Sequence, residues 1–299
     1  MTEPGDARTA VIVAAHGRRG RLKDAHAAEH PYVVRGRRLR VVCGDRVQWE
    51  PGQHNEVTVT ALQPRANSLR RLDTARNTTE VLAANLTLVG VVCASEPEPD
   101  WFVIDRYLCA AADMDAGAII VVNKCELGRP DPAELDTYRR AGYRVLEVSA
   151  QAGQGLPALA QAFDDETGIL VGQSGVGKSS LINRLVPGVA VSTSGLTRGT
   201  AEGRHTTTAS VMHPLPGGGR LIDAPGVRDF LPVIDDDRAV QVGFAEILAA
   251  AAHCRFTDCR HMREPGCAVK TAVEKAEISA RRYESYRRLL RSTQSATSR

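Results

Sequence analysis

The eight residues Gly172-Gln-Ser-Gly-Val-Gly-Lys-Ser179 fit the phosphate-loop pattern G-x-x-x-x-G-K-[ST] in full. Glycines at these positions let backbone N–H groups curl around phosphate oxygens, and the helix after them adds its positive N-terminal dipole. In such loops Lys178 neutralises β- and γ-phosphate charge and so assists catalysis, while Ser179 is a ligand of Mg²⁺. The sequence thus predicts a nucleoside triphosphate site. Its phosphate-holding residues are expected to be Gly172, Gln173, Ser174, Gly175, Val176, Gly177, Lys178, Ser179 and Ser180.

A second phosphate-side motif, Asp223-Ala-Pro-Gly226, ends a short strand downstream of the phosphate loop. A carboxylate at Asp223 can help to hold Mg²⁺, and the Gly226 N–H can reach the γ-phosphate. Ras-like enzymes place a Gln nearby to orient the attacking water. Here Val227 comes next and no Gln lies close, so the water must be oriented by another group or by a partner.

A polar loop, residues 194–208, connects these two motifs and has no clear helical or strand period. Loops of this kind order around the γ-phosphate and Mg²⁺. We expect a threonine, Thr206 or Thr207, to supply the second protein hydroxyl to Mg²⁺, with Thr207 preferred. His205 is the candidate for a direct part in hydrolysis, although a surface histidine with no role is an equal alternative.

The base-reading residues are expected upstream, in Asn123-Lys-Cys-Glu126, which fits the N-K-x-D pattern with Glu in place of Asp. A carboxylate at Glu126 accepts from guanine N1–H and from the 2-amino group, which adenine does not offer. Lys124 is expected to lie over the base. Ser149-Ala150 ends the next strand, where the Ala150 N–H can meet guanine O6.

The order of these motifs differs from that of most P-loop GTPases, in which the phosphate loop comes first. Here the base motif precedes the phosphate loop, and the cyclic order is otherwise kept. The sequence therefore predicts a circular permutation, which can preserve a sheet because domain termini often lie close together. The permutation also joins the segment after Gly226 to the C-terminal region, so that a switch movement could pull on that region.

A cluster of three cysteines and a histidine lies near the C-terminus, at Cys254, Cys259, His261 and Cys267. Four N and S ligands suit a closed tetrahedral site for one structural Zn²⁺, and no open position would remain for catalysis. Free cysteines beside a chance histidine are the simpler alternative. The other four cysteines lie in apolar or strand-like segments and are expected to be buried free thiols.

The elements that position these residues divide into three regions. Short β-type runs in residues 1–72, among them 39–42, indicate a small barrel, for which an OB-fold is preferred and an SH3-like barrel is the alternative. Strand–helix alternation over 73–234 predicts a parallel α/β domain. Residues 235–299 are expected to form a helical zinc-binding domain with a charged helix over 274–291.

Charge is distributed unevenly along the 299 residues. Residues 1–76 hold 14 Lys+Arg against 8 Asp+Glu, residues 77–253 hold 13 against 22, and residues 254–299 hold 11 against 5. Basic ends around an acidic middle indicate two arms for a polyanion, with simple solubilisation as the alternative. No apolar run approaches the roughly 20 residues that cross a bilayer, and the N-terminus lacks a secretory signal. We expect a cytoplasmic protein that does not enter the membrane.

Together these features resemble the ribosome small-subunit-dependent GTPase family (RsgA, also called YjeQ). The most specific features are the motif order, the segment 203–208 and the spacing of the Cys₃His cluster. The resemblance implies a GTPase, with GTP or GDP and Mg²⁺ bound, that acts late in maturation of the bacterial 30S subunit. It implies contacts of the OB-fold and the zinc domain with 16S rRNA, and hydrolysis stimulated by the subunit. The chain departs from the family pattern at Glu126 and at Ala224, where Ser or Thr is common.

Two other functions stay open at this stage. One is an rRNA-binding module whose GTPase is weak or vestigial, and the other is an ATP-preferring P-loop ATPase or kinase. We expect a monomer.

Overall fold

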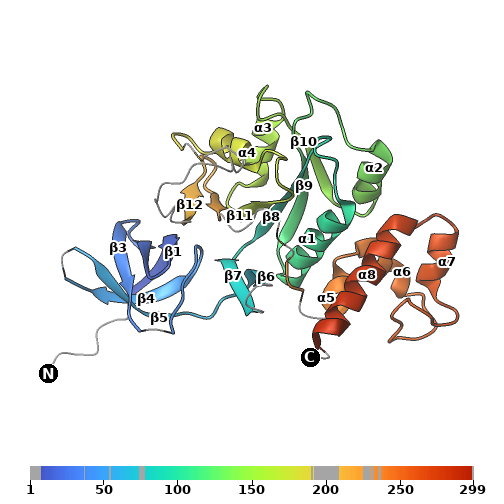
Figure 1. Cartoon of the computed structure of the whole chain (residues 1–299), viewed down its shortest axis with the longest axis horizontal. Coiled ribbons are helices and arrows are strands. Elements are labelled where there is room, and N and C mark those ends of the chain that lie inside the picture. The colour runs from blue at the N-terminus through green and yellow to red at the C-terminus, as the bar shows by residue number, and fades with distance from the viewer. Residues whose placement is uncertain are drawn as a thin grey trace, which may run out of the picture.

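The computed structural model contains a barrel, a central α/β body and a C-terminal group of helices, which succeed one another along the chain (Figure 1). It describes residues 8–36, 38–53, 55–73, 78–189, 191, 209–224, 230, 232–234 and 237–297. Among these residues, no helix is long and apolar enough to cross a membrane.

Five strands build the barrel: β1 (Arg8–His16), β2 (Arg19–Asp24), β3 (Glu29–Val34), β4 (Arg46–Pro51) and β5 (Val57–Leu62). β1 pairs with β2 on one side and with β4 on the other, which closes the barrel, and β3 pairs in parallel with β5. The strands form because apolar side chains alternate toward one core, where Ile12, Leu22 and Val47 are fully buried. The OB-fold prediction is confirmed.

The run 39–42 does not form the strand that we expected. Ahead of β4 the carboxylate of Asp45 accepts from the Val42 N–H at 2.8 Å and from the Arg65 guanidinium at 2.6 and 2.9 Å. Asp45 is fully buried, so these contacts are well shielded from water. A local side-chain acceptor thus replaces a strand partner for this backbone.

A two-stranded hairpin, β6 (Ser68–Asp73) and β7 (Thr78–Ala84), comes after the barrel. The domain boundary that we expected, between residues 72 and 73, lies within this hairpin. The hairpin also receives a later part of the chain, because Val233 donates its N–H to Arg70 O at 3.0 Å and Pro232 bridges to Arg71.

The central sheet has six strands: β8 (Leu88–Cys93), β9 (Gly117–Val122), β10 (Arg144–Glu147), β11 (Thr167–Val171), β12 (Ser210–Pro214) and β13 (Arg220–Asp223). Their order is β10-β9-β8-β11-β13-β12, and all neighbours are parallel except β12 and β13. Its helices are α1 (Trp101–Asp113), α2 (Pro132–Arg140), α3 (Leu156–Ala162) and α4 (Lys178–Leu185). β8 is buried along its whole length, as expected for a central parallel strand.

The barrel and the central sheet are joined by hydrogen-bonded strands. β12 pairs antiparallel with β1, with Ala14 opposite Val211 and Ala15 opposite Ser210. All strands except those of the hairpin therefore belong to one eleven-stranded sheet among the described residues.

The C-terminal module contains α5 (Asp237–Val242), α6 (Ala245–Ala251), α7 (Ala268–Glu274) and α8 (Ala280–Thr297). α8 packs against α1 and α5, and Figure 1 shows it beside the central body. The charged helix that we expected over 274–291 begins only at Ala280 and continues to Thr297, because α7 ends at Glu274 and a turn follows. Ala276 has a φ of 58°, and the next two N–H groups both donate to Ala272 O, which turns the chain before α8.

Candidate nucleotide-binding site and metal centre

The phosphate loop connects β11 to α4, and two of its glycines are required by close contacts. Gly172 has a φ of 136°, and a Cβ atom there would lie 2.2 Å from Val92 O. Gly177 has a φ of 93°, and its Cβ would lie 2.3 Å from Asn123 Nδ2. Larger residues would meet both an unfavourable backbone conformation and a steric clash. These glycines thus bring the loop against β8 and against the base motif.

Lys178, the first residue of α4, is held inside the phosphate loop. Its ammonium group donates to the carbonyl oxygens of Gly172 and Gln173, each at 2.6 Å. The side chain is only 8% exposed. The cation is therefore held in place by carbonyl groups of the loop itself.

Asn123 fastens the phosphate loop to the two base-reading segments. Its Nδ2 donates to Val176 O at 2.9 Å, and its Oδ1 accepts from the Ala150 N–H at 3.1 Å. The residue is 1% exposed, so this amide is an internal brace. The Ala150 N–H that we expected at guanine O6 is directed to Asn123 in this structure.

Ser149 closes a tight turn after β10. It is fully buried, its hydroxyl accepts from the Ala152 N–H at 2.8 Å, and its own N–H donates to Gln154 O at 2.9 Å. The turn holds Ala150 and Gln151 beside Asn123.

A pocket of about 400 Å³ opens where these segments meet. Its lining consists of Asn123, Lys124, Glu126, Leu127, Ala150, Gln151, Gly177, Ser180, Asn183 and Arg184. Among these residues, Glu126 is exposed to solvent. The structure thus brings residues of the base motif and of the phosphate loop together around one cavity. Asn183 and Arg184 were not anticipated, although they lie on the helix that the phosphate loop begins.

The loop between β8 and α1 is hydrogen-bonded both to the phosphate loop and to the base motif. Gln173 Oε1 accepts from the Asp100 N–H at 2.9 Å, and its Nε2 donates to Glu98 O at 3.4 Å. Lys124 Nζ donates to Glu96 O at 2.9 Å. The side chain of Gln173 therefore joins the phosphate loop to the loop before α1. The sequence pattern G-x-x-x-x-G-K-[ST] does not reveal this contact, because it accepts any residue at the position of Gln173.

The magnesium-side residues are described in part. Asp223 ends β13, which pairs in parallel with β11, so its carboxylate leaves the sheet at the edge where the phosphate loop begins. Ser179 lies in the first turn of α4. His205, Thr207 and Gly226 lie outside the described residues.

Comparison with known proteins identifies the family. The RsgA GTPase family model matches residues 62–231, which is more than half of the chain. The chain belongs to the RsgA GTPase family. Membership of this family makes the chain a GTP hydrolase, in agreement with its phosphate loop and base motif.

Two curated relatives in the RsgA family carry the name small ribosomal subunit biogenesis GTPase RsgA. The protein of Azotobacter vinelandii is 42% identical over 257 residues, which cover 84% of this chain and 75% of that protein. The protein of Pseudomonas aeruginosa is 39% identical over 294 residues, which cover 96% of this chain and 86% of that protein.

Two solved structures confirm the permuted architecture. YjeQ from Thermotoga maritima aligns with a TM-score of 0.74 at 27% identity and covers 97% of this chain and 99% of its own. YloQ, described as a circularly permuted GTPase, aligns with a TM-score of 0.72 at 23% identity and covers 99% of this chain and 98% of its own; at that identity it shows the fold alone.

The four predicted zinc ligands meet in the C-terminal module. Their ligand atoms lie within 4.8 Å of one another. His261 Nδ1 is 3.5 Å from the Sγ atoms of both Cys254 and Cys267, and those sulfurs are 3.9 Å apart. A tetrahedron with the usual Zn–S and Zn–N lengths has edges of about 3.8 Å between sulfurs and about 3.6 Å from sulfur to nitrogen. The donor set therefore fits Zn²⁺.

Neighbouring groups fix the shape of the zinc loop. The Glu264 carboxylate accepts from the backbone N–H groups of Arg260, Met262 and Arg263, at 2.8 to 3.1 Å. Tyr283 on α8 donates its hydroxyl to His261 O at 2.5 Å. Burial lowers the pKa of His261, which favours the neutral imidazole that a metal requires. When bound, the metal would cross-link the two ends of this loop, and Tyr283 joins the loop to α8.

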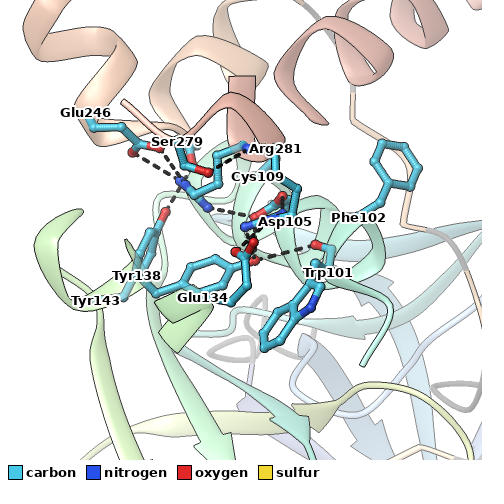
Figure 2. A network of polar contacts seen from close by, with 12 residues as sticks. Trp101, Phe102, Asp105, Cys109, Glu134, Tyr138, Tyr143, Glu246, Ser279 and Arg281 are labelled. Atoms are coloured by element: carbon cyan, nitrogen blue, oxygen red, sulfur yellow. Dashed lines mark hydrogen bonds and ion pairs between the residues drawn. The ribbon is translucent and has the colours of Figure 1, made fainter. Parts of the chain in front are cut away.

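A buried ionic network fastens the C-terminal module, called the zinc module below, to the central domain (Figure 2). Asp105 on α1 is fully buried and accepts from Arg282 at 2.6 Å, from Arg281 at 2.7 Å and from the Tyr138 hydroxyl at 2.7 Å. Arg282, also fully buried, donates to both oxygens of Glu246 at 2.5 and 3.0 Å. Burial alone would lower the pKa of Arg282, but the two carboxylates raise it well above its usual range.

The segment that leads from the phosphate side to the zinc module is also anchored. Tyr107 on α1 donates its hydroxyl to Phe230 O at 2.7 Å, and Arg106 donates to Pro232 O at 3.0 Å. Together with the network around Asp105, these contacts tie the described part of this connection to α1. A switch movement that was transmitted through the segment after Gly226 would therefore have to overcome both sets of contacts before it displaced the zinc module.

Proposed function

We propose that this protein is a GTPase that binds the 30S ribosomal subunit and 16S rRNA and assists late small-subunit maturation. The observation that carries the proposal is the joining of Asn123, the phosphate loop and Glu126 around one pocket in the permuted order. The names of the curated relatives support the link to the small subunit. We also propose that the protein acts in the cytoplasm, away from the membrane, and that it is a monomer.

Within this proposal the phosphate loop and Asp223 hold GTP or GDP with Mg²⁺. Ser179 and Thr207 provide the hydroxyl ligands of the metal, Lys178 stabilises charge on the transferred phosphoryl group, and Gly226 senses the γ-phosphate. The pocket selects guanine through Glu126, since only guanine offers two N–H donors at that edge.

The polyanion contacts are assigned to the two ends of the chain, with domains at 1–72, 73–234 and 235–299. The barrel exposes Arg19, Arg35, Arg38 and Arg40, and the zinc module carries the second excess of Lys and Arg. Cations of this kind neutralise phosphates, which supplies sequence-independent affinity for RNA.

The decisive experiment measures GTP turnover with and without purified 30S subunits. We expect the subunit to stimulate hydrolysis, because no glutamine near Asp223 orients the water. The His205→Ala variant should lose subunit-stimulated turnover far more than GTP affinity, and an equal loss of both would remove His205 from the mechanism. Undetectable turnover at saturating subunits, or a preference for ATP in competition, would overturn the proposed function.

A further inference from the structure

The first turn of α1 is held from two directions by segments that lie far apart in the sequence. Asp100 caps this helix, because its carboxylate accepts from the N–H groups of Phe102 at 3.0 Å and of Val103 at 3.2 Å. A cap of this kind satisfies N–H groups that have no partner within the helix, so it fixes where the helix begins. Contacts with Asp100 and its neighbours therefore set the position of the first turn.

The phosphate loop holds the cap of α1 through one side chain. Gln173, the second residue of that loop, accepts from the Asp100 N–H at 2.9 Å and donates to Glu98 O at 3.4 Å. The carbonyl oxygen of Gln173 accepts from the Lys178 ammonium group at 2.6 Å, so the same residue contacts the cation of the loop. Gln173 thus joins the nucleotide site to the residue at which α1 begins.

The zinc module holds the next two residues of α1 through arginines of α8. The guanidinium carbon of Arg281 lies 5.8 Å from the ring centroid of Trp101. The guanidinium carbon of Arg288 lies 3.9 Å from the ring centroid of Phe102. A cation over an aromatic face is attracted to it, so both contacts fasten α8 to the first turn of α1. The residues held by the phosphate loop and by α8 are therefore adjacent in the chain.

A further contact with α8 follows in the same helix. Asp105, about 7.5 Å along the helix axis from Asp100, accepts from Arg281 at 2.7 Å and from Arg282 at 2.6 Å (Figure 2). Both carboxylate oxygens are thus bound by α8, and the aspartate is fully buried. Because backbone hydrogen bonds connect successive helical turns, the contacts of Gln173 and those of α8 act on one stiff piece of chain.

We propose that α1 couples the nucleotide site to the zinc module. A bound nucleotide orders the phosphate loop and with it Gln173, which is the positioning residue on the phosphate side; Arg281 and Arg288 position the same turn from the zinc side. A coupling between two sites is reciprocal, so a bound nucleotide holds the zinc module more firmly on α1, and a docked zinc module raises the affinity for the nucleotide. The inference rests on the proposed nucleotide site and not on the 30S subunit.

The first test measures the affinity of the full-length protein for fluorescent GDP. Gln173→Met keeps the length of the side chain and removes both hydrogen bonds, so we expect it to weaken GDP binding about fivefold. Arg281→Met removes the contacts with Trp101 and Asp105 and should weaken GDP binding about fourfold. In the double variant the loss should stay close to that of Gln173→Met alone, because the hydrogen bonds that connect the phosphate loop to α1 are then missing.

A matched control is Arg287→Met on the same helix. The Arg287 guanidinium pairs with Glu284 at 3.0 Å and lies over the ring of Tyr283, and both partners belong to α8. The substitution removes one cation from α8 and leaves its contacts with the first turn of α1 in place. We expect the affinity for GDP to stay within about twofold of that of the unmodified protein.

The second test compares hydrogen exchange with and without saturating GDP, and it needs no change in the zinc module. In the unmodified protein, GDP should slow exchange in α8 about threefold or more. In Gln173→Met at saturating GDP, this slowing should be absent. A residue that only stabilised the fold would leave the GDP-dependent difference unchanged. This readout also decides the question if Arg281→Met does not fold.

Three results would overturn the inference. They are an unchanged affinity for GDP in Gln173→Met, a double variant whose loss equals the product of the two single losses, and the same slowing of exchange in Gln173→Met as in the unmodified protein. A weakening in Arg287→Met as large as in Arg281→Met would also contradict it, since that would be an effect of charge alone. An absence of turnover with 30S subunits would refute the proposed function, whereas the GDP measurements would still test the coupling.

Discussion

The buried network around Asp105 allows a quantitative prediction for Arg282→Met. Methionine keeps the apolar stem of arginine but has no guanidinium, so it loses the contacts with the rings of Phe244 and Tyr138, whose centroids lie 4.7 and 4.9 Å from the guanidinium carbon. It removes the ion pairs with Asp105 and Glu246, both of which bind Arg282 where it is fully buried. The change therefore removes the charge while an apolar side chain still fills part of the site.

The expected cost is set by the partner that is left behind. Removing one member of a buried ion pair costs about 3–5 kcal/mol, since an uncompensated charge stays in the interior. Asp105 keeps Arg281 and the Tyr138 hydroxyl, and Glu246 is partly exposed to water, so we expect the lower end, about 3 kcal/mol. At about 2–4 °C per kcal/mol for chains of 150–250 residues, the melting temperature should fall by about 6–12 °C.

Calorimetry or a thermal shift assay measures this loss, and hydrogen exchange locates it. Exchange should increase in α8 and in the facing turns of α1 and α2. The control is Arg287→Met on the same helix, whose ion pair with Glu284 is partly exposed, so it should cost under about 1 kcal/mol.

Adding Asp105→Leu to Arg282→Met should destabilise less than the sum of the two single changes, since both buried charges are then removed. Equal effects of Arg282→Met and Arg287→Met, or a shift below about 2 °C, would show that the network does not hold the zinc module.

Three further predictions concern the site, the metal and the RNA contact. Glu126→Ala should weaken GDP binding about tenfold and leave ADP binding unchanged, as measured by fluorescent nucleotide titration; a parallel loss for both nucleotides would remove Glu126 from base selection. Cys259→Ser should lower bound zinc, measured by atomic absorption, and expose the loop 254–267 to protease, whereas Cys109→Ser, a buried thiol outside the cluster, should retain the metal. Replacing Arg38 and Arg40 with alanine should reduce the dependence of 30S affinity on salt by about one unit of log–log slope for each phosphate that is no longer neutralised, and an unchanged slope would place the RNA contact elsewhere.

The permuted order has a structural consequence for the two ends of the molecule. The zinc module is attached to α1 through the ion pairs of Arg281 and Arg282 with Asp105, and to α2 through the ion pair of Arg281 with Glu134, in addition to the chain connection after Pro232. The barrel is attached at β12, two residues after the switch segment. Of these attachments, that of the barrel at β12 is therefore closest in sequence to the loop 194–208, which is expected to contact the γ-phosphate.

The sequence by itself predicted the chemistry of both centres. The phosphate-loop pattern, the N-K-x-E motif and the Cys₃His spacing consist of residue types whose function depends on local backbone and ligand chemistry, so they can be recognised without a fold. The order of those motifs also predicted the circular permutation, because cyclic order is a property of the chain.

Only the tertiary structure decided which side chains brace these centres. Asn123 spans to Val176, 53 positions away, and Asp105 meets Arg282, 177 positions away. Such pairs carry no sequence signal, since each residue is an ordinary amide or charge until packing places it against its partner and removes water. The turns at Ala276 and Asp45 have a different origin, because local hydrogen bonds to Ala272 O and to the Asp45 carboxylate outweighed the helix and strand propensities expected there.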